Sequence, residues 1–290
     1  MMTRRDLFAA AAAAGAAAIA GPRSAPVGVQ MYTVRNIINK DTEGTIRTIA
    51  EIGYSAVEAG RSELVQLQPL LKKYKLAAPV ASLETPLITG KWQLWRAKEA
   101  GWDDALESVK AVGARWATIA YLMPPERSDI PGFIEKMNAA GEKCGKAGIQ
   151  LCYHNHCFEF GGEKGRRPID LMLKGFDPKL VKFELDVFWV SVGGQDPAEF
   201  IRANAKHIGL IHLKDKAEGT PVQFNEMVKP EAFKEVGSGV LDFPAIIKAA
   251  SAAGAGYYMV EQDQTPGNPL DSLRKSFEYL KSIKAPGLKI

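Results

Sequence analysis

Histidine, aspartate and glutamate gather at the ends of short apolar runs in this chain. The runs 152–156 (Cys-Tyr-His-Asn-His) and 211–215 (Ile-His-Leu-Lys-Asp) contain three of its four histidines. Phe-Glu-Leu-Asp at 183–186 lies between them, and Val-Glu-Gln-Asp at 260–263 follows. Imidazole and carboxylate groups together bind divalent cations. The pattern therefore indicates a metal site built from the ends of several strands.

Side-chain alternation along a strand places several of these groups on one face. Residues two apart point the same way, so His154 and His156 share a face, as do His212 and Lys214. A single strand histidine is usually a hydrogen-bonded core residue, but four polar strand ends in succession favour one shared site. His207 opens its strand at the opposite end and is interpreted as structural.

The chain alternates β-rich runs with helical stretches, and this order predicts the fold. Eight expected strands alternating with helices, and no glycine-rich turn after the first strand, favour a (β/α)8 TIM barrel over a doubly wound α/β sheet. The expected strands are 27–32, 56–59, 77–83, 116–121, 149–154, 181–186, 208–213 and 257–261. The expected helices are 42–52, 62–74, 92–112, 133–147, 197–205, 243–253 and 270–283. A single barrel domain is expected over residues 26–290.

The carboxyl ends of barrel strands carry the active site in this fold. The side chains expected there are Gln30, Tyr32, Glu58, Glu84, Tyr121, His154, His156, Glu184, Asp186, His212, Lys214, Glu261 and Asp263.

The first 25 residues resemble a twin-arginine export signal. Thr-Arg-Arg-Asp-Leu-Phe at 3–8 precedes an alanine-rich run at 9–21, and small residues follow. The alternative is a frayed alanine-rich helix. The apolar run is too short for a stable membrane anchor. We expect a periplasmic or exported protein that engages the twin-arginine export machinery.

Composition excludes one class of partner. The net charge is only +4, and basic residues do not cluster as a nucleic-acid surface requires. A hydrophobic content of 46% allows a sizeable core. We expect a small-molecule partner and no nucleic acid, and a homo-oligomer stays open.

Several motifs together resemble the xylose-isomerase-like TIM-barrel superfamily, which includes the sugar phosphate isomerase/epimerase family. The resemblance extends over the whole chain after the export signal. It is carried by residues 27–35, 53–58, 153–160, 184–189, 211–215, 236–243 and 260–263.

The resemblance implies one divalent metal ion held by a glutamate, an aspartate, a histidine and a second glutamate. Asp186, His212 and Glu261 match the last three positions. This chain has His154 where the first glutamate is expected, so Glu159 is the predicted fourth ligand and His154 is the alternative. Mn²⁺ is the expected ion, with Mg²⁺, Co²⁺ or Zn²⁺ as alternatives.

The resemblance also implies carbanion chemistry. We expect an isomerase or epimerase that acts on an unphosphorylated sugar or keto-sugar through a metal-stabilised enediolate. One alternative is a 3-keto-glycoside lyase or hydrolase that works by β-elimination on the same site. The second is a non-catalytic exported sugar-binding barrel. The expected catalytic side chains are His156, His154, Lys214 and Glu261, with His156 as a base of ordinary pKa near 6.5.

The expected carbohydrate contacts lie around the strand ends. Gln30, Tyr32, Glu58 and Trp189 are predicted to bind substrate, and Trp92 is a further stacking candidate. The Val-Gly-Ser-Gly run at 236–239 has two interpretations. Its backbone N–H groups bind a ligand or phosphate, or it is a tight turn before a helix capped by Asp242.

Overall fold

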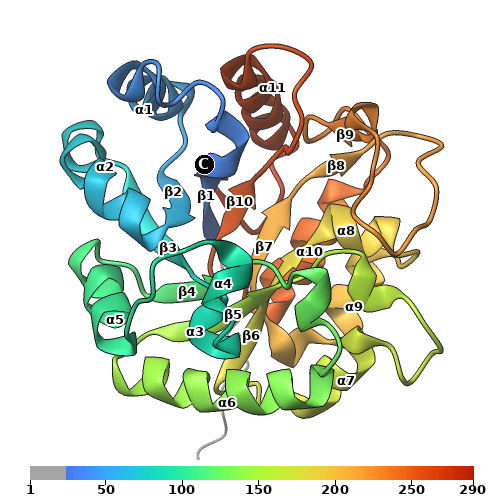
Figure 1. The fold of residues 1–290 in the computed structure, drawn as a ribbon. Coiled ribbons are helices and arrows are strands. Elements are labelled where there is room, and N and C mark those ends of the chain that lie inside the picture. The colour runs from blue at the N-terminus through green and yellow to red at the C-terminus, as the bar shows by residue number, and fades with distance from the viewer. Residues whose placement is uncertain (1–23) are drawn as a thin grey trace, which may run out of the picture.

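Eight parallel strands close on themselves into a barrel in the computed structural model, which describes residues 24–290 (Figure 1). Their order is β10-β7-β6-β5-β4-β3-β2-β1, and β1 pairs back with β10. The predicted TIM barrel is therefore confirmed. The strands are β1 (Ala25–Gln30), β2 (Ala56–Gly60), β3 (Ala77–Leu83), β4 (Trp116–Ile119), β5 (Gln150–His154), β6 (Val181–Asp186), β7 (Ile208–Leu213) and β10 (Tyr258–Val260).

The predicted export signal, residues 1–25, lies outside the described residues except for its last two. Ala25, which we assigned to the signal, is the first residue of β1 and is buried. The short strand β11 (Leu288–Lys289) pairs with this start of β1.

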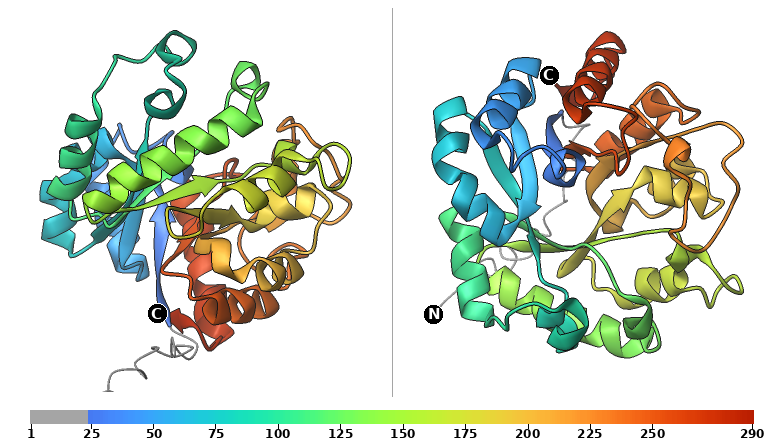
Figure 2. Two further views of the ribbon diagram at one scale, coloured as in Figure 1. Left: turned by 90° about the horizontal axis from the view of Figure 1, so that it is seen from below. Right: turned by 45° about the horizontal axis from the view of Figure 1, so that its top comes forward.

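Helices surround the barrel (Figures 1 and 2). Several begin at an aspartate whose carboxylate accepts a backbone N–H of the first turn, as Asp41, Asp129 and Asp242 do. The main helices are α1 (Thr42–Ile52), α2 (Arg61–Tyr74), α5 (Trp102–Ala111), α6 (Ile130–Lys146), α7 (Pro168–Gly175), α8 (Val187–Val192), α9 (Pro197–Ala203), α10 (Phe243–Ala253) and α11 (Pro269–Ser282).

The side chains inside the barrel change from apolar to polar between positions two residues apart along the strands. A lower layer contains Ala56, Cys152, Leu210 and Met259, together with Val80. Two residues further along four of these strands, on the same face, come Glu58, His154, His212 and Glu261. The alternation that buries the lower layer therefore also directs these polar groups into the barrel.

The predicted helix 92–112 is wrong in its middle. The chain forms α4 (Trp92–Trp95), turns at Arg96, whose φ is 48°, and begins α5 only at Trp102. Buried Glu126 holds this irregular segment in place, because its carboxylate accepts hydrogen bonds from Thr89 and Trp95. The segment 84–101, which also contains α3 (Pro86–Thr89), projects from one end of the barrel (Figure 2).

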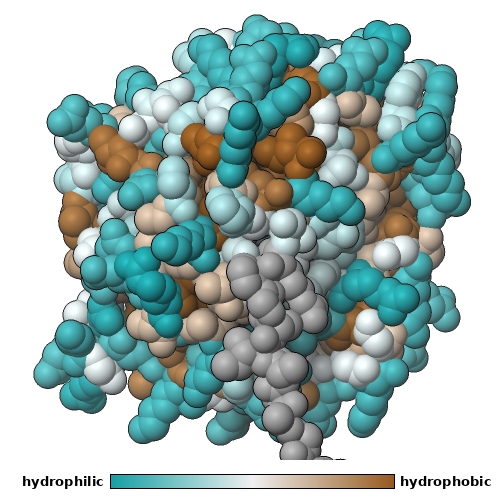
Figure 3. Space-filling view, turned by 180° about the vertical axis from the view of Figure 1, so that it is seen from behind, coloured by the Kyte–Doolittle hydropathy of each residue, from teal (hydrophilic) through white to brown (hydrophobic). Residues whose placement is uncertain are grey.

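The surface is largely hydrophilic on the face opposite that of Figure 1, with small separate apolar areas (Figure 3). Within residues 24–290, every helix is too short or too polar to cross a bilayer.

Gly237 offers a test of backbone constraint in the loop before α10. Its φ is +88°, and an added Cβ would overlap the Tyr279 ring. We expect Gly237→Ala to cost about 1–2 kcal/mol for the left-handed backbone and about 1–3 kcal/mol more for the overlap. Gly219→Ala is the control, because Gly219 has a φ of +72° and open space around it. Equal losses in urea-unfolding free energy would show that the Tyr279 contact does not matter.

Candidate metal centre

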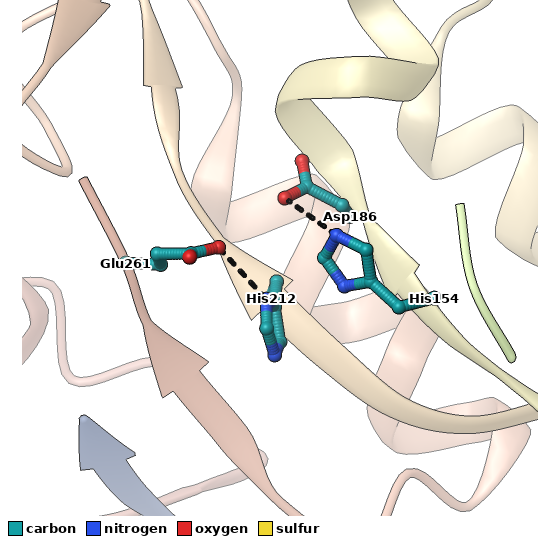
Figure 4. Close-up of side chains that lie close together, drawn as sticks. All are labelled: His154, Asp186, His212 and Glu261. Carbon is teal, nitrogen blue, oxygen red and sulfur yellow. Dashed lines mark hydrogen bonds and ion pairs between the residues drawn. The ribbon is translucent and has the colours of Figure 1, made fainter. Parts of the chain in front are cut away.

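Four side chains from four neighbouring strands converge at the carboxyl end of the barrel (Figure 4). His154 ends β5, Asp186 ends β6, His212 lies in β7 and Glu261 follows β10. One ligand atom from each lies within 4.8 Å of all the others, and all four side chains are buried. We call these residues the metal cluster.

The metal cluster fits a divalent ion. His212 Nδ1 lies 3.1 Å from Glu261 Oε2, and His154 Nε2 lies 3.8 Å from Asp186 Oδ2. Burial, followed by the neighbouring His212, lowers the pKa of His154 to about 4, so its imidazole is neutral and offers a lone pair. Asp186 uses Oδ1 to cap α8 at Trp189 N, which leaves Oδ2 facing the cluster. Two imidazoles and two carboxylates are a donor set that such ions accept.

Lys214 neutralises part of this buried negative charge. Its Nζ lies 3.1 Å from Asp186 Oδ2, 2.8 Å from Glu261 Oε2 and 2.6 Å from Asp263 Oδ1. Burial alone would lower the pKa of Lys214, but these three carboxylates outweigh it and raise that pKa well above 10.5. Lys214 is therefore an ammonium that also reaches the cavity above the cluster.

Glu159, our predicted fourth ligand, lies outside the metal cluster. Its carboxylate accepts the Tyr153 hydroxyl at 2.7 Å and the His156 backbone N–H at 3.0 Å. Residues 158–160 form a short helical turn that holds this side chain behind the strand instead of over it. The prediction is corrected: His154 occupies the fourth place in the cluster.

A cavity of about 730 Å³ opens above the metal cluster. Gln30 and Tyr32 line it, as predicted for substrate-binding residues. The other lining groups that bear on function are His154, His156, His212, Lys214, Glu261, Asp263, Arg35, Trp95 and Tyr121.

Two predicted substrate contacts do not reach this cavity. Glu58 is fully buried beneath it, 3.0 Å from His212 Nε2. Trp189 is buried behind His156, with 5.3 Å between the ring centroids. It starts a helix directly after Asp186, so strand alternation does not describe its direction.

His156 lies between Tyr121 and Trp189, partly buried in the cavity wall. Burial, with lesser contributions from His154 and Lys214, lowers its pKa well below 6.5. The expected ordinary pKa is therefore wrong, and the imidazole is neutral at physiological pH. A neutral imidazole beside the cavity can accept a proton.

Two residues of the cavity wall, Trp95 and Arg35, were not predicted as site residues from the sequence. Trp95, not Trp92, lines it, because the break at Arg96 sets the direction of α4. Arg35 also lines it and donates to the backbone oxygens of Tyr32 and Asp263. Arg35 belongs to the 27–35 motif, but only the fold shows that its side chain reaches the mouth of the cavity.

The Val-Gly-Ser-Gly loop is a turn held from within. Buried Asp215 accepts the backbone N–H groups of Gly237, Gly239 and Leu241 at 3.0, 2.8 and 3.2 Å. Asp242 caps α10, as the second interpretation predicted. These N–H groups are directed at a carboxylate of the same chain and not at the cavity.

His207 lies away from the site, as predicted. It ends a short turn before β7 and packs against the Phe183 ring. It belongs to neither group of clustered ligand side chains found in the described residues.

Metal retention should separate His154 from Glu159. We expect His154→Ala and Asp186→Ala to lose the ion, because each removes a ligand atom of the cluster. Glu159→Gln should keep it, since an amide oxygen still accepts the Tyr153 hydroxyl. His207→Ala is the folding control, and elemental analysis after gel filtration gives the metal content. Metal loss in Glu159→Gln with His154→Ala unchanged would reverse the assignment.

Metal affinity should depend on pH through His212. Burial alone would lower the pKa of His212, but Glu184 and Glu58 outweigh it and raise that pKa well above 6.5. The metal-free imidazole is therefore protonated at neutral pH, and an ion must displace that proton. Apparent affinity should rise with pH, by up to about tenfold per unit for one proton. Chelator competition at several pH values measures this, and a flat profile would mean that His212 is already neutral.

Known proteins share this fold and part of this sequence. The xylose isomerase-like TIM barrel family matches residues 46–283. An inosose dehydratase from Geobacillus thermodenitrificans is 28% identical over 158 residues, 51% of this chain and 52% of the relative. The chain thus spans about half the length of that relative. Another inosose dehydratase, from Mesomycoplasma hyopneumoniae, is 26% identical over 271 residues, 82% of this chain and 87% of the relative.

A solved structure agrees with the fold. It is a sugar phosphate isomerase/epimerase from Parabacteroides distasonis, 26% identical with a TM-score of 0.70, and the match covers 93% of this chain and 97% of that one. The matched range of the family takes in the strands that supply the metal cluster. The chain therefore belongs to the xylose isomerase-like TIM barrel family.

Proposed function

We propose that the protein is a metal-dependent lyase that removes a β-substituent from a keto-sugar or keto-glycoside. The observation that carries this proposal is the ligand set. Glu261 is the only glutamate in the metal cluster, because His154 takes the place expected for the other and Glu159 faces away. The family resemblance implied two metal-bound glutamates, which would serve an epimerase as its acid/base pair. One base suffices for elimination.

A bound divalent ion would polarise the substrate carbonyl and acidify the neighbouring C–H bond. His156 is neutral and lies in the cavity wall, so it can take that proton. The C–O bond to the β-substituent then breaks as a C=C bond forms. The imidazolium returns the proton to the departing oxygen, which leaves as water or an alcohol, so the step balances without a second acid.

Lys214 and the carboxylates around it orient the substrate in this proposal. The ammonium is held by Asp186, Glu261 and Asp263 and lines the cavity, where it can donate to a substrate oxygen. Burial raises the pKa of Asp263 to about 6. We propose Mn²⁺ as the ion, with Mg²⁺, Co²⁺ or Zn²⁺ as alternatives.

An unphosphorylated substrate is part of the proposal. Arg35 is engaged with two backbone oxygens at the mouth. The amides of the 237–241 loop are directed at Asp215. These two groups would otherwise bind a phosphate, but both already donate hydrogen bonds within the protein. Isomerase or epimerase activity is the second candidate, favoured by the 26% identical isomerase/epimerase structure.

Export is proposed on the sequence alone. The twin arginines at 4 and 5 and the apolar run after them support passage through the twin-arginine machinery to the periplasm or beyond. Fusion of residues 1–25 to a reporter protein, with Arg4→Lys/Arg5→Lys as the control, tests it.

Replacement of His156 should separate chemistry from metal binding. We expect His156→Ala to keep the ion and to lower turnover by roughly 10²–10⁴-fold, the usual contribution of a general base. Metal content and rate are measured on the same preparation. Loss of both metal and turnover would make His156 a ligand. Unchanged metal content and unchanged turnover would exclude it as the base.

Product analysis with a 3-keto-glycoside decides the reaction type. A lyase releases the alcohol and an unsaturated keto-sugar, whereas an epimerase returns an isomer of unchanged mass. Solvent deuterium at the α-carbon with no product would indicate reversible proton abstraction without elimination. If the protein binds the 3-keto-glycoside but gives neither deuterium exchange nor product, the non-catalytic sugar-binding barrel is the remaining interpretation.

A further inference from the structure

A second group of polar side chains lies in the barrel beneath the metal cluster. Glu58 of β2, Glu184 of β6 and His212 of β7 each place a ligand atom within 4.8 Å of the other two. The hydroxyl of Thr118 on β4 lies beside Glu184. We call these four residues the lower cluster. His212 belongs to both clusters: Nδ1 faces Glu261 and Nε2 faces Glu58.

The lower cluster is sealed from solvent and short of hydrogen bonds. Glu58, Glu184 and Thr118 are fully buried. Both carboxylate oxygens of Glu184, one of Glu58 and the Thr118 hydroxyl have no hydrogen bond of ordinary geometry. Buried carboxylates without partners are costly, and native structures satisfy such groups or bind an ion there.

We propose that the lower cluster holds a second divalent cation, in a closed structural site that lies beneath the metal cluster and shares His212 with it. The spacing of the donor atoms fits a tetrahedral ion. Ligand bonds of about 2.0–2.2 Å place tetrahedral donors about 3.3–3.6 Å apart. His212 Nε2 lies 3.0 Å from Glu58 Oε2 and 3.4 Å from Glu184 Oε1, so small shifts of these side chains suffice.

The charge state of the lower cluster is compatible with a cation. Burial and the neighbouring Glu184 raise the pKa of Glu58 to about 8, so this carboxyl holds a proton that a bound ion would displace. His212 belongs to both clusters. A neutral imidazole has a single free lone pair, so His212 would bind two ions only as an imidazolate, through both ring nitrogens.

The donor set and burial indicate the kind of ion. Three oxygens and one imidazole nitrogen without an open position would form a closed four-coordinate site, and Zn²⁺ accepts imidazole nitrogen and carboxylate oxygen in tetrahedral geometry. The two sites should differ in exchange. The metal cluster opens to the cavity, whereas the lower cluster is covered by the metal cluster above and the apolar layer below. A chelator should therefore remove the upper ion readily and the lower ion only on unfolding.

Metal counting on the full chain tests the proposal. Protein produced with Zn²⁺ is dialysed against EDTA, and its zinc is measured before dialysis, after it and after unfolding in urea. We expect about two ions per chain at first, about one after EDTA and none after unfolding. Asp186→Ala should lose only the labile ion, and Glu184→Gln only the retained one. Glu159→Gln is the matched control, because Glu159 is equally buried and lies outside both clusters.

Three outcomes would overturn the proposal. These are a wild type with no more than one ion per chain, a Glu184→Gln variant that keeps the retained ion, and a folded Glu184→Gln variant that loses both ions. The last result would mean that the protein binds a single ion, in the metal cluster, and that Glu184 only helps to position its ligands. If Glu184→Gln does not fold, Thr118→Val takes its place and should make the retained ion accessible to EDTA. Wild-type protein that contains only one ion per chain and still turns over a keto-glycoside would refute the second site and leave the lyase proposal intact.

Discussion

Buried negative charge at the carboxyl end of the barrel is the constraint on which the rest of the site depends. The carboxyl groups of Glu58, Glu184, Asp186 and Glu261 all lie buried inside the barrel, and burial together with the neighbouring Glu184 raises the pKa of Glu58 to about 8. Lys214 offsets the upper pair, Asp186 and Glu261, and these carboxylates together with Asp263 raise its pKa well above 10.5. The apolar layer beneath provides the dry surroundings that make these interactions strong. A cation-binding centre is the chemical outcome of that arrangement.

Alternation along parallel strands explains what the sequence could predict. Asp186, His212 and Glu261 lie at or next to the ends of strands whose apolar residues fix their register, so their convergence followed from the pattern. The depth at which a side chain lies inside the barrel does not follow from this alternation. Glu58 pairs with Gln30 in the sheet, yet only Gln30 reaches the cavity, because strand tilt decides which inward groups lie deep.

Short turns after the strands account for the wrong assignments. Glu159 sits in a three-residue helical turn, and its carboxylate accepts the Tyr153 hydroxyl instead of joining the metal cluster. Trp189 follows an immediate strand-to-helix change, and Trp95 precedes the left-handed residue Arg96. Period-two patterns carry no information about such directions. The fold was thus predictable as a whole, whereas the membership of the site was predictable only for residues inside regular strands.

Asp215 has a consequence for the range of ligands that this barrel can acquire. Successive amides pointing into one concavity form an anion nest, and here the nest is filled by a carboxylate of the same chain. The protein thus carries its own intramolecular competitor for any free anion at that loop. A mutational route toward phosphorylated ligands would therefore begin with the loss of this internal anion, before any change in the cavity wall.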